Sequence, residues 1–320
     1  MSVRSKVPAQ KGQSFGEGII KWCKAFGYQW QLQLMILPGI IYMIVFNFIP
    51  IYGLVLAFKN YTVTDTIGDA PWVGLENFIV ILGDKYFWDS VVNTMAISVI
   101  KLLVGFIVPI VLAIMIYEVP FKPFQKIVQT FTYLPHFFSW IILGGMLINW
   151  LSSHGMINDL LHFVGVNAHA NYLLDANKYW VIAAASDVWK EAGWGTILYL
   201  STMAGIDPSL YEAAEMDGAS KIARIWHITI PEIRMMITLN LILSVSGLLN
   251  SNLDQTLVLM NSQNQPKAEV INSYVYRIGL SQGDFSYATA VGLGVSVVSV
   301  ILLVITNVLS KKLNDNQSVF

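Results

Sequence analysis

The chain has 320 residues, of which 55% are hydrophobic and only 12% are Asp, Glu, Lys or Arg, with a formal net charge of -1. A typical soluble domain carries about 25% charged residues, so this composition excludes a soluble globular protein and indicates a polytopic membrane protein. The single cysteine, Cys23, excludes an internal disulfide and a cysteine-based metal cluster. The five histidines lack the close spacing with carboxylates that helical zinc sites use, so no metal site is predicted.

Residues 1–33 form a polar N-terminal tail that precedes the first long apolar run. The first fourteen residues, MSVRSKVPAQKGQS, lack an apolar segment, so no cleavable signal peptide is evident. Apolar residues from Ile19 to Phe26 alternate with Lys21 and Lys24. This pattern suits a short helix lying in the membrane interface, and it suits a disordered basic tail equally well.

Six apolar stretches are each long enough to cross a bilayer core of about 30 Å as a helix of about 20 residues. They predict an all-α integral membrane protein with six transmembrane helices in one membrane domain, residues 34–312, followed by a C-terminal tail at 313–320. The fourth and fifth stretches carry more polar residues than the others. The six predicted spans are Leu34–Phe58, Val91–Tyr117, Phe131–Leu151, Tyr179–Met203, Met235–Leu259 and Tyr287–Leu309.

The lysines and arginines of the short connections predict the orientation of these spans. With six spans, both termini share a side with the second–third and fourth–fifth connections, and that side holds twelve positive residues against five opposite. Connections rich in Lys and Arg stay in the cytoplasm. Both termini and the long polar loop at 205–233 are therefore expected on the cytoplasmic side.

That loop, GIDPSLYEAAEMDGASKIARIWHITIPEI (205–233), is the most charged stretch of the chain. Asp207 followed by Pro208 is typical of a helix N-cap and the first helical position. Gly218 is a natural helix stop, and Pro231 is expected to end a second helix. The two predicted helices cover residues 209–217 and about 219–228.

One face of the first predicted loop helix is narrow and built from small side chains. Leu210, Ala213, Ala214 and Asp217 share this face at i, i+3, i+4 and i+7 spacing. Alanines let another surface approach closely, so the face suits docking against a partner. An ordinary solvated helical hairpin is the alternative.

The spacing in EAAEMDGASKIARIWHITIP resembles the EAA motif of permease subunits of binding-protein-dependent ABC importers. In that motif Glu-Ala-Ala is followed by Gly four positions after the last Ala and then by I-x-L-P. Ile230 replaces the usual Leu, which keeps bulk and polarity. The residues in register are Glu212, Ala213, Ala214, Gly218, Ile228 and Pro231.

Further segments are similar to the carbohydrate branch of that family, in particular to permeases for oligosaccharides and polysaccharide fragments. The resemblance runs from about residue 34 to the C-terminus. Many sugar permeases carry GGP after the fifth span, where this chain has MNSQNQP, so the particular sugar is left open. The similar segments are YLPHFFSW (133–140), DVWKEAGWGTILYL (187–200), LDQTLVL (253–259) and YVYRIGLSQGDFSYATAVG (274–292).

The resemblance implies a type I ABC-importer permease with the MetI-like fold in a bacterial cytoplasmic membrane. The implied partners are a second permease subunit, often a different chain, two cytosolic ATPase subunits, an external solute-binding protein, a carbohydrate substrate and the lipid bilayer, with no nucleic acid. The polar loop would dock an ATPase subunit. The implied coupling residues are Glu212, Ala213, Ala214, Asp217, Gly218, Ile228 and Pro231.

The chain lacks the G-x-x-x-x-G-K-[ST] phosphate loop. ATP and Mg²⁺ are therefore expected on the partner ATPase subunits, while this chain is expected to have no cofactor and no catalytic residue. A transport subunit rather than an enzyme is predicted.

Charged residues inside a membrane span cost about 2.5–3.5 kcal/mol each, so they mark candidate functional positions. Three such residues lie within about one turn of the fourth span and can gather on one face. They either neutralise one another, beside a helix break near Gly193 and Gly195, or serve translocation or gating. Lys101 in the second span either snorkels or meets a partner chain. The three residues are Asp187, Lys190 and Glu191.

The fifth span contains LLNSNLDQ, whose amide and carboxylate groups suit hydrogen bonds to a sugar. Nearby tryptophans could supply faces on which a sugar ring stacks, although packing or the membrane interface explains each of them as well. The candidates for the substrate pathway are Asn250, Asn252, Asp254 and Trp189, with Trp140 and Trp194 as further stacking faces.

Two other interpretations remain open. The solute of such an importer could be a peptide or a polyol instead of a sugar. A membrane-embedded enzyme would have to use the Asp187–Glu191 group, and no nucleophile–base arrangement accompanies it. A secondary transporter usually shows internal repeats, and none is found in this sequence.

Overall fold

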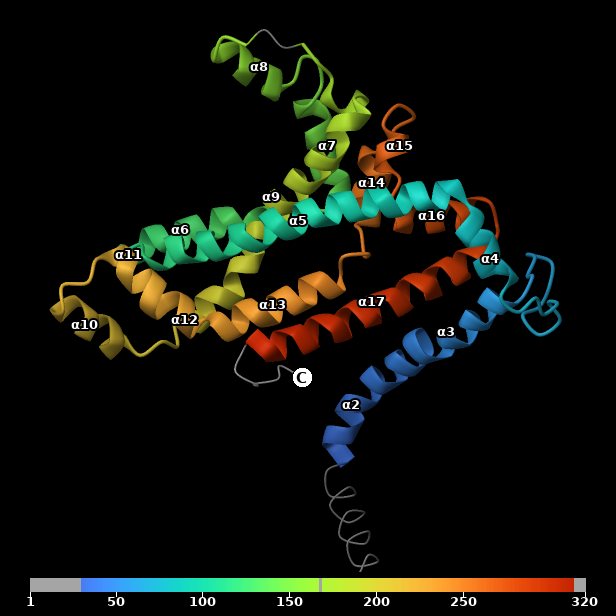
Figure 1. The fold of residues 1–320 in the computed structure, drawn as a ribbon, viewed down its shortest axis with the longest axis horizontal. Coiled ribbons are helices and arrows are strands. Elements are labelled where there is room, and N and C mark those ends of the chain that lie inside the picture. Colours follow the sequence, from blue (N-terminus) through green and yellow to red (C-terminus); the bar gives the residue numbers. More distant parts are fainter. Residues whose placement is uncertain (1–29, 167–168, 314–320) are drawn as a thin grey trace, which may run out of the picture. The chain divides into compact units, whose positions relative to one another are not determined.

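The computed structural model describes residues 30–166 and 169–313, with side chains to residue 308 (Figure 1). The predicted interfacial helix at Ile19–Phe26 and the C-terminal residues 314–320 lie outside the described residues. Every regular element of the described part is a helix, and an isolated antiparallel bridge joins Lys59 to Trp72. Contacts divide the chain into two units, residues 1–55 and 56–320.

The first predicted span is found as a helical run from Trp30 to Phe58 that is apolar enough to cross a membrane. Pro38 and Pro50 lie within this run, and the spacing changes to π before Pro50 and to 3-10 after it. Such changes accommodate a residue that cannot donate a backbone hydrogen bond. The elements of the run are α2 (Trp30–Met43), η1 (Ile44–Phe48), α3 (Ile49–Ile51) and η2 (Tyr52–Phe58).

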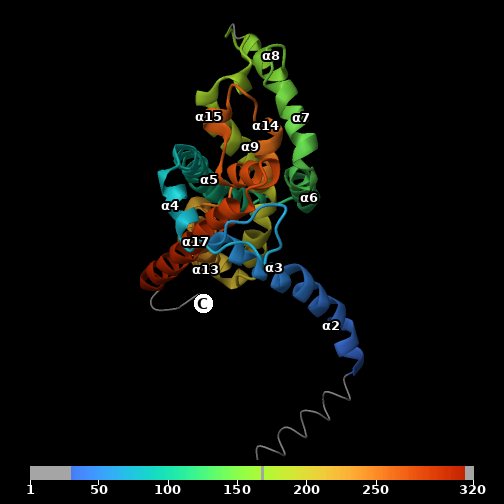
Figure 2. The same ribbon diagram turned by 90° about the vertical axis from the view of Figure 1, so that its right-hand side faces the viewer.

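In the second unit the long helices α5 and α9 pack against each other along much of their length, and α13 lies along α17 (Figures 1 and 2). The elements are α4 (Glu76–Gly83), α5 (Lys85–Tyr117), α6 (Lys122–Tyr133), η3 (Leu134–Phe137), α7 (Trp140–Trp150), α8 (Met156–Phe163), η4 (Tyr172–Leu174), α9 (Ala176–Met203), α10 (Pro208–Met216), α11 (Lys221–Arg224), η5 (Ile225–Thr229), α12 (Ile230–Glu232), α13 (Arg234–Ser246), α14 (Leu253–Leu259), α15 (Gln265–Ala268), α16 (Ile271–Tyr276), η6 (Arg277–Ser281) and α17 (Phe285–Leu313).

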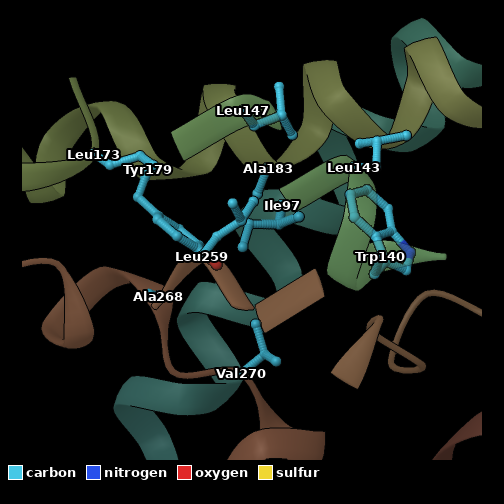
Figure 3. Packing of buried hydrophobic residues seen from close by; sticks show 10 residues of the cluster. All are labelled: Ile97, Trp140, Leu143, Leu147, Leu173, Tyr179, Ala183, Leu259, Ala268 and Val270. Carbon is cyan, nitrogen blue, oxygen red and sulfur yellow. The ribbon is translucent and has the colours of Figure 1, made fainter. Parts of the chain in front are cut away.

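A buried apolar cluster joins α5, α7, α9, α14 and the segment around α15 (Figure 3). Lipid tails are as apolar as leucine, so close packing rather than exclusion of water holds such helices together in a membrane. The approach of α7 to α14 requires Gly144, because a Cβ there would lie 2.4 Å from Cγ1 of Val258. Among the members of the cluster are Ile97, Trp140, Leu143, Leu147, Tyr179 and Leu259.

The third predicted span, Phe131–Leu151, is not one straight helix, and this prediction was wrong in detail. The helical segments Lys122–Phe137 and Trp140–Trp150 meet at an angle of 99°. Ser139 has an extended backbone and starts α7 as its N-cap, with its Oγ accepting a hydrogen bond from the backbone N–H of Ile142. The two sides of the break differ in composition: α6 contains Lys122, Lys126 and two glutamines, whereas α7 contains no charged residue.

The fifth predicted span, Met235–Leu259, is also interrupted. The helix α13 ends at Ser246, and α14 begins only after Asn252, whose side-chain oxygen accepts a hydrogen bond of 3.1 Å from the backbone N–H of Gln255. Asn252 is therefore a helix cap, a role in which asparagine is strongly preferred. Two short helices and an irregular connection replace the expected continuous span.

Length and composition mark three helices of the described residues as membrane spans, or five segments if each of two bent pairs counts as one. The bent pairs are Lys122–Phe137 with Trp140–Trp150, and Lys221–Glu232 with Arg234–Ser246. The 28-residue α9 is long enough to span, but it carries three charged residues near its centre. Six spans result if α9 crosses the membrane and each bent pair contributes one crossing, so the number stays a prediction.

A polar cluster fixes the start of α5 against α16 and α17. Asp84 is the N-cap of α5, with a carboxylate oxygen 2.8 Å from the backbone nitrogen of Tyr86. The hydroxyl of Tyr274 donates to the same carboxylate, and the hydroxyl of Tyr287 donates to it at 2.9 Å. Burial alone would raise the pKa of Asp84, but these hydrogen bonds outweigh it and lower the pKa.

Replacing Asp84 with alanine is expected to destabilise the protein by about 2–4 kcal/mol, because a helix cap and the acceptor of two partly buried hydroxyls are lost together. Asp84→Asn keeps an oxygen acceptor and should cost less. The lowered pKa means that the carboxylate stabilises the fold above its unfolded pKa of about 3.9, and that this stabilisation is lost as the pH falls through the folded-state value. Thermal unfolding of the purified protein in detergent across acidic pH measures both effects, and an Asn variant as acid-sensitive as the parent would contradict the assignment.

Candidate functional site

The polar loop begins with the predicted capped helix. The side chain of Asp207 accepts a hydrogen bond of 2.9 Å from the backbone N–H of Ser209, and Pro208 occupies the first helical position of α10. Hydrogen bonds from the backbone and side chain of Ser209 lower the pKa of Asp207. The first loop helix is confirmed, displaced by one residue at each end.

The predicted stop at Gly218 is confirmed as well. Gly218 has a φ of 77°, a left-handed conformation that glycine adopts without steric cost. Its N–H donates to the carbonyl of Glu215 at 3.0 Å, and the N–H of Ala219 donates to the carbonyl of Ala214 at 2.9 Å. This pair of bonds is the Schellman motif, which closes a helix end and directs the chain away from it.

The second loop helix continues beyond the predicted end before Pro231, so that prediction was wrong. Ser220 caps α11, and the helical run passes through the π segment η5 to Glu232. In a regular α-helix the ring of Pro231 would meet the carbonyl four residues earlier. The wider π turn directly before it provides room for the ring, and the sequence alone does not announce such a turn.

The loop is packed firmly against the ends of two long helices. Ile206 and Ile233, one at each end of the loop, are buried together with Ala113 of α5 and with Tyr199 and Met203 of α9. Two polar contacts hold the loop helices to each other: Tyr211 Oη lies 3.0 Å from Thr229 Oγ1, and Arg224 pairs with Glu215 at 3.1 Å. The loop is therefore in direct contact with the ends of α5 and α9.

The motif residues lie on the accessible side of this loop. Glu212, Ala213, Asp217, Gly218 and Pro231 are exposed, while Ala214 and Ile228 are half-buried. Three large apolar side chains that sequence reasoning missed are exposed beside them, which is typical of an interaction surface. The sequence could have indicated them, because they are large apolar residues within an otherwise polar loop. These are Met216 (88% exposed), Ile222 (69%) and Trp226 (63%).

A second candidate site is a cavity of about 480 Å³ between α5, α9 and α13. Its lining includes the charged side chains of Lys101, Asp187 and Glu191. Trp194 and Asn250 also line it. Pockets that place a few polar groups on a mostly apolar wall are the usual sites for small ligands.

The three charged residues predicted to cluster on α9 form two separate groups in the structure, one at Asp187 and one at Lys190 and Glu191. Asp187 forms an ion pair of 2.8 Å with Lys101 of α5, so Lys101 has its partner within this chain, which neither expectation for Lys101 included. Glu191 contacts Nδ1 of His136 at 2.6 Å and Nζ of Lys190 at 3.3 Å. Asp187 is thus neutralised across helices by Lys101, whereas Lys190 and Glu191 pair with each other on α9, as predicted.

His136 connects the bend before α7 to this charge group. Its backbone carbonyl accepts a hydrogen bond of 2.5 Å from Nζ of Lys190, and its ring stacks on Trp194 with centroids 4.3 Å apart. The segment between α6 and α7 is therefore attached to α9 by both charge and stacking. Sequence spacing did not indicate this role for His136.

The helix break expected near Gly193 and Gly195 does not occur, since α9 runs unbroken from Ala176 to Met203. Both glycines instead allow close approach. A Cβ on Gly193 would lie 1.8 Å from the carbonyl oxygen of Thr132, and one on Gly195 would lie 3.1 Å from the ring of Pro109.

Of the predicted substrate-pathway residues, the structure brings Asn250 to the cavity together with Trp194. Asn252 caps α14, and Asp254 is exposed in the first turn of that helix. Trp189 packs near Trp150, with ring centroids 5.9 Å apart, while Trp140 is buried in the apolar cluster. None of these four is among the cavity-lining residues.

Residues 105–315 match the family model described as "Binding-protein-dependent transport system inner membrane component". The Bacillus subtilis polygalacturonan/rhamnogalacturonan transport system permease protein YteP is 40% identical over 285 residues, covering 89% of this chain and 88% of that protein. A crystal structure of a bacterial alginate ABC transporter in complex with an alginate pentasaccharide-bound periplasmic protein has a TM-score of 0.82 at 33% identity, covering 92% of this chain and 98% of that one. A second, of a bacterial ABC transporter that imports the acidic polysaccharide alginate, has a TM-score of 0.82 at 34% identity, covering 91% and 99%.

Proposed function

This chain belongs to the family of inner membrane components of binding-protein-dependent transport systems, and on that basis we propose that it is the permease subunit of an ABC importer for oligosaccharides or polysaccharide fragments. Its fold is the MetI-like fold of type I importer permeases. The observation that carries the proposal is the exposed loop at 205–233 with its EAA motif (the EAA loop), which packs on the ends of α5 and α9, the two helices that also line the charged cavity.

The substrate class rests on the relatives. YteP is named for polygalacturonan and rhamnogalacturonan, and the solved neighbours are alginate transporters. All of these substrates are saccharide chains, which favours oligosaccharides over a peptide or a polyol. The cavity of about 480 Å³ is lined by the indole of Trp194, one face of which stacks on His136, and by the amide of Asn250, the kinds of group with which proteins bind sugar rings and hydroxyls.

The energy source is a partner. Two cytosolic ATPase subunits bind ATP and Mg²⁺, and each docks on one permease through the face that contains Glu212, Ala213, Ala214 and Asp217. A second permease subunit completes the membrane part, and an external solute-binding protein delivers the substrate. The periplasmic protein in one solved neighbour supports this last partner.

The charge bias of the connections supports a cytoplasmic position for the EAA loop and both termini. The membrane domain then covers residues 34–312, between cytoplasmic tails at 1–33 and 313–320. When the ATPase subunits close, the loop moves with them, and the buried cluster at Ile206 and Ile233 transmits the motion to α5 and α9. Because both helices line the cavity, this motion changes access to it.

Changing Glu212 to lysine is expected to weaken association with the ATPase subunits about tenfold or more, because the variant reverses a charge on the proposed docking face. The test is co-purification of the ATPase from membranes, together with uptake of labelled oligosaccharide. Glu76→Lys is a matched control, since it reverses an exposed charge on α4, away from the loop. If Glu212→Lys keeps normal association and uptake while inserting into the membrane, the docking role is wrong.

A further inference from the structure

We propose that Lys101 binds the carboxylate groups of an acidic oligosaccharide during transport, and that Asp187 pairs with Lys101 between passages of substrate. This inference rests on the proposed function and names the substrate class of the same cavity: chains that contain uronic acids. The supporting observation is that Lys101 is the one ammonium group among the described residues that line the cavity, and that its partner is itself a carboxylate.

The position of Lys101 requires a partner. Lys101 lies sixteen residues from either end of the 33-residue α5, so it is at the centre of a helix long and apolar enough to span the membrane. An ammonium ion at that depth is costly unless it is paired. Its Nζ lies 2.8 Å from Oδ2 of Asp187, and the side chains are 26% and 11% exposed.

An ammonium group has three donors, and one contact with Asp187 leaves donors that can turn toward the cavity. A substrate carboxylate that displaces Asp187 keeps the charge of Lys101 neutralised, and Asp187, which also lines the cavity, then faces the cavity without a cation until the substrate leaves. A neutral sugar hydroxyl does not neutralise it, so it competes poorly for Lys101 in an environment of low dielectric constant. The geometry therefore favours a carboxylate over a hydroxyl at this position.

The other charges near the cavity are held in place and are not free for substrate. Lys190 has a side chain only 8% exposed, donates to the carbonyl of His136, pairs with Glu191 and lies 6.0 Å from the ring centroid of Trp140. Glu191 would repel an anionic substrate if it were unpaired, but it contacts both His136 and Lys190. Of the described residues that line the cavity, Lys101 is the only cation.

The chemistry of the relatives' substrates agrees with this assignment. Polygalacturonan consists of galacturonate units, and alginate is an acidic polysaccharide, so their fragments present carboxylates at regular intervals. Trp194 and Asn250 line the same cavity and suit the sugar ring and its hydroxyls. Lys101 would thus add selection for charge to a site that otherwise recognises saccharides in general.

The test uses the complete transporter in proteoliposomes, with its solute-binding protein and ATPase subunits. Uptake is compared for a labelled oligogalacturonate and for its neutral methyl ester, each at a concentration that saturates the solute-binding protein. In Lys101→Gln the ratio of acidic to neutral uptake is expected to fall about tenfold or more, as expected for loss of a hydrogen bond to a charged group. Lys101→Arg retains the charge and should retain most of the preference.

Asp187→Asn provides a second readout that a purely structural ion pair would not produce. Removing the competing carboxylate should lower the concentration of acidic oligomer needed for half-maximal uptake. The double variant Lys101→Gln, Asp187→Asn removes both charges, so it leaves neither ion unpaired, and it should still lack the acidic preference.

Equal losses of acidic and neutral uptake in Lys101→Gln would show that the pair is structural and would overturn the inference. A wild-type transporter that imports only the neutral oligomer would overturn the inference while leaving the proposed function intact. A transporter that assembles and hydrolyses ATP but imports neither oligomer would contradict the oligosaccharide function itself, and the inference with it.

Discussion

Gly193→Ala is expected to destabilise the protein by about 3 kcal/mol or more, at the upper end of what overpacking costs. The added Cβ would lie 1.8 Å from the carbonyl oxygen and 2.3 Å from the carbonyl carbon of Thr132. Both are backbone atoms at the end of α6, so no side chain can rotate away to make room. Either α9 or the end of α6 must shift.

Such a shift also reaches the charged cavity. Lys190 and Glu191 lie within one turn of Gly193 and hold His136, whose segment follows directly on α6. Moving α9 away from Thr132 therefore stretches these contacts, and we expect uptake to be lost even in molecules that remain folded.

Gly145→Ala is the matched control, because a Cβ at that position of α7 meets nothing within 4 Å. Alanine is the better helix former by up to about 1 kcal/mol, so this variant should be as stable as the parent or slightly more stable. Thermal unfolding of the purified complex in detergent compares the two. A Gly193→Ala protein that melts at the parent temperature would contradict the close approach of α9 to α6.

Gly218→Val is expected to uncouple ATP hydrolysis from uptake. Gly218 has a φ of 77°, and a residue with a side chain pays about 1–2 kcal/mol in this left-handed conformation, with β-branched residues at the high end. Nothing lies within 4 Å of a Cβ at this position, so the cost arises from the backbone and not from crowding. The strain is relieved by unwinding the last turn of α10, which displaces Ala214 and Asp217 from the docking face.

Gly218→Asn is the control for this prediction, since asparagine visits the left-handed region far more readily than valine. Uptake and substrate-stimulated ATP hydrolysis should be retained in the Asn variant. In the Val variant uptake should fall about tenfold, if most of this backbone strain energy is lost from the free energy of docking to the ATPase subunit. A Val variant that couples as well as the Asn variant would show that the shape of this turn has no part in transmission.

Local rules predicted the EAA loop because local hydrogen bonds form it. The cap at Asp207, the proline after it and the left-handed Gly218 each act within four residues, so short-range preferences determine the outcome. Composition predicted the membrane class for a similar reason, since each span must be apolar over its own length. Local rules did not predict that the second loop helix continues past Pro231, because a π turn leaves no simple pattern in the sequence.

The sequence by itself determined that the chain is a helical membrane protein with a capped helical loop at 205–233, because these properties depend on composition and on neighbours along the chain. Only the tertiary structure decided that Asp187 meets Lys101, that His136 holds Glu191, and that Gly193 touches Thr132. It also placed Asn250 at the cavity and made Asn252 a helix cap. These outcomes depend on which faces of α5, α6 and α9 turn toward each other, and the residues that meet lie far apart in the sequence, so preferences of neighbouring residues do not determine them.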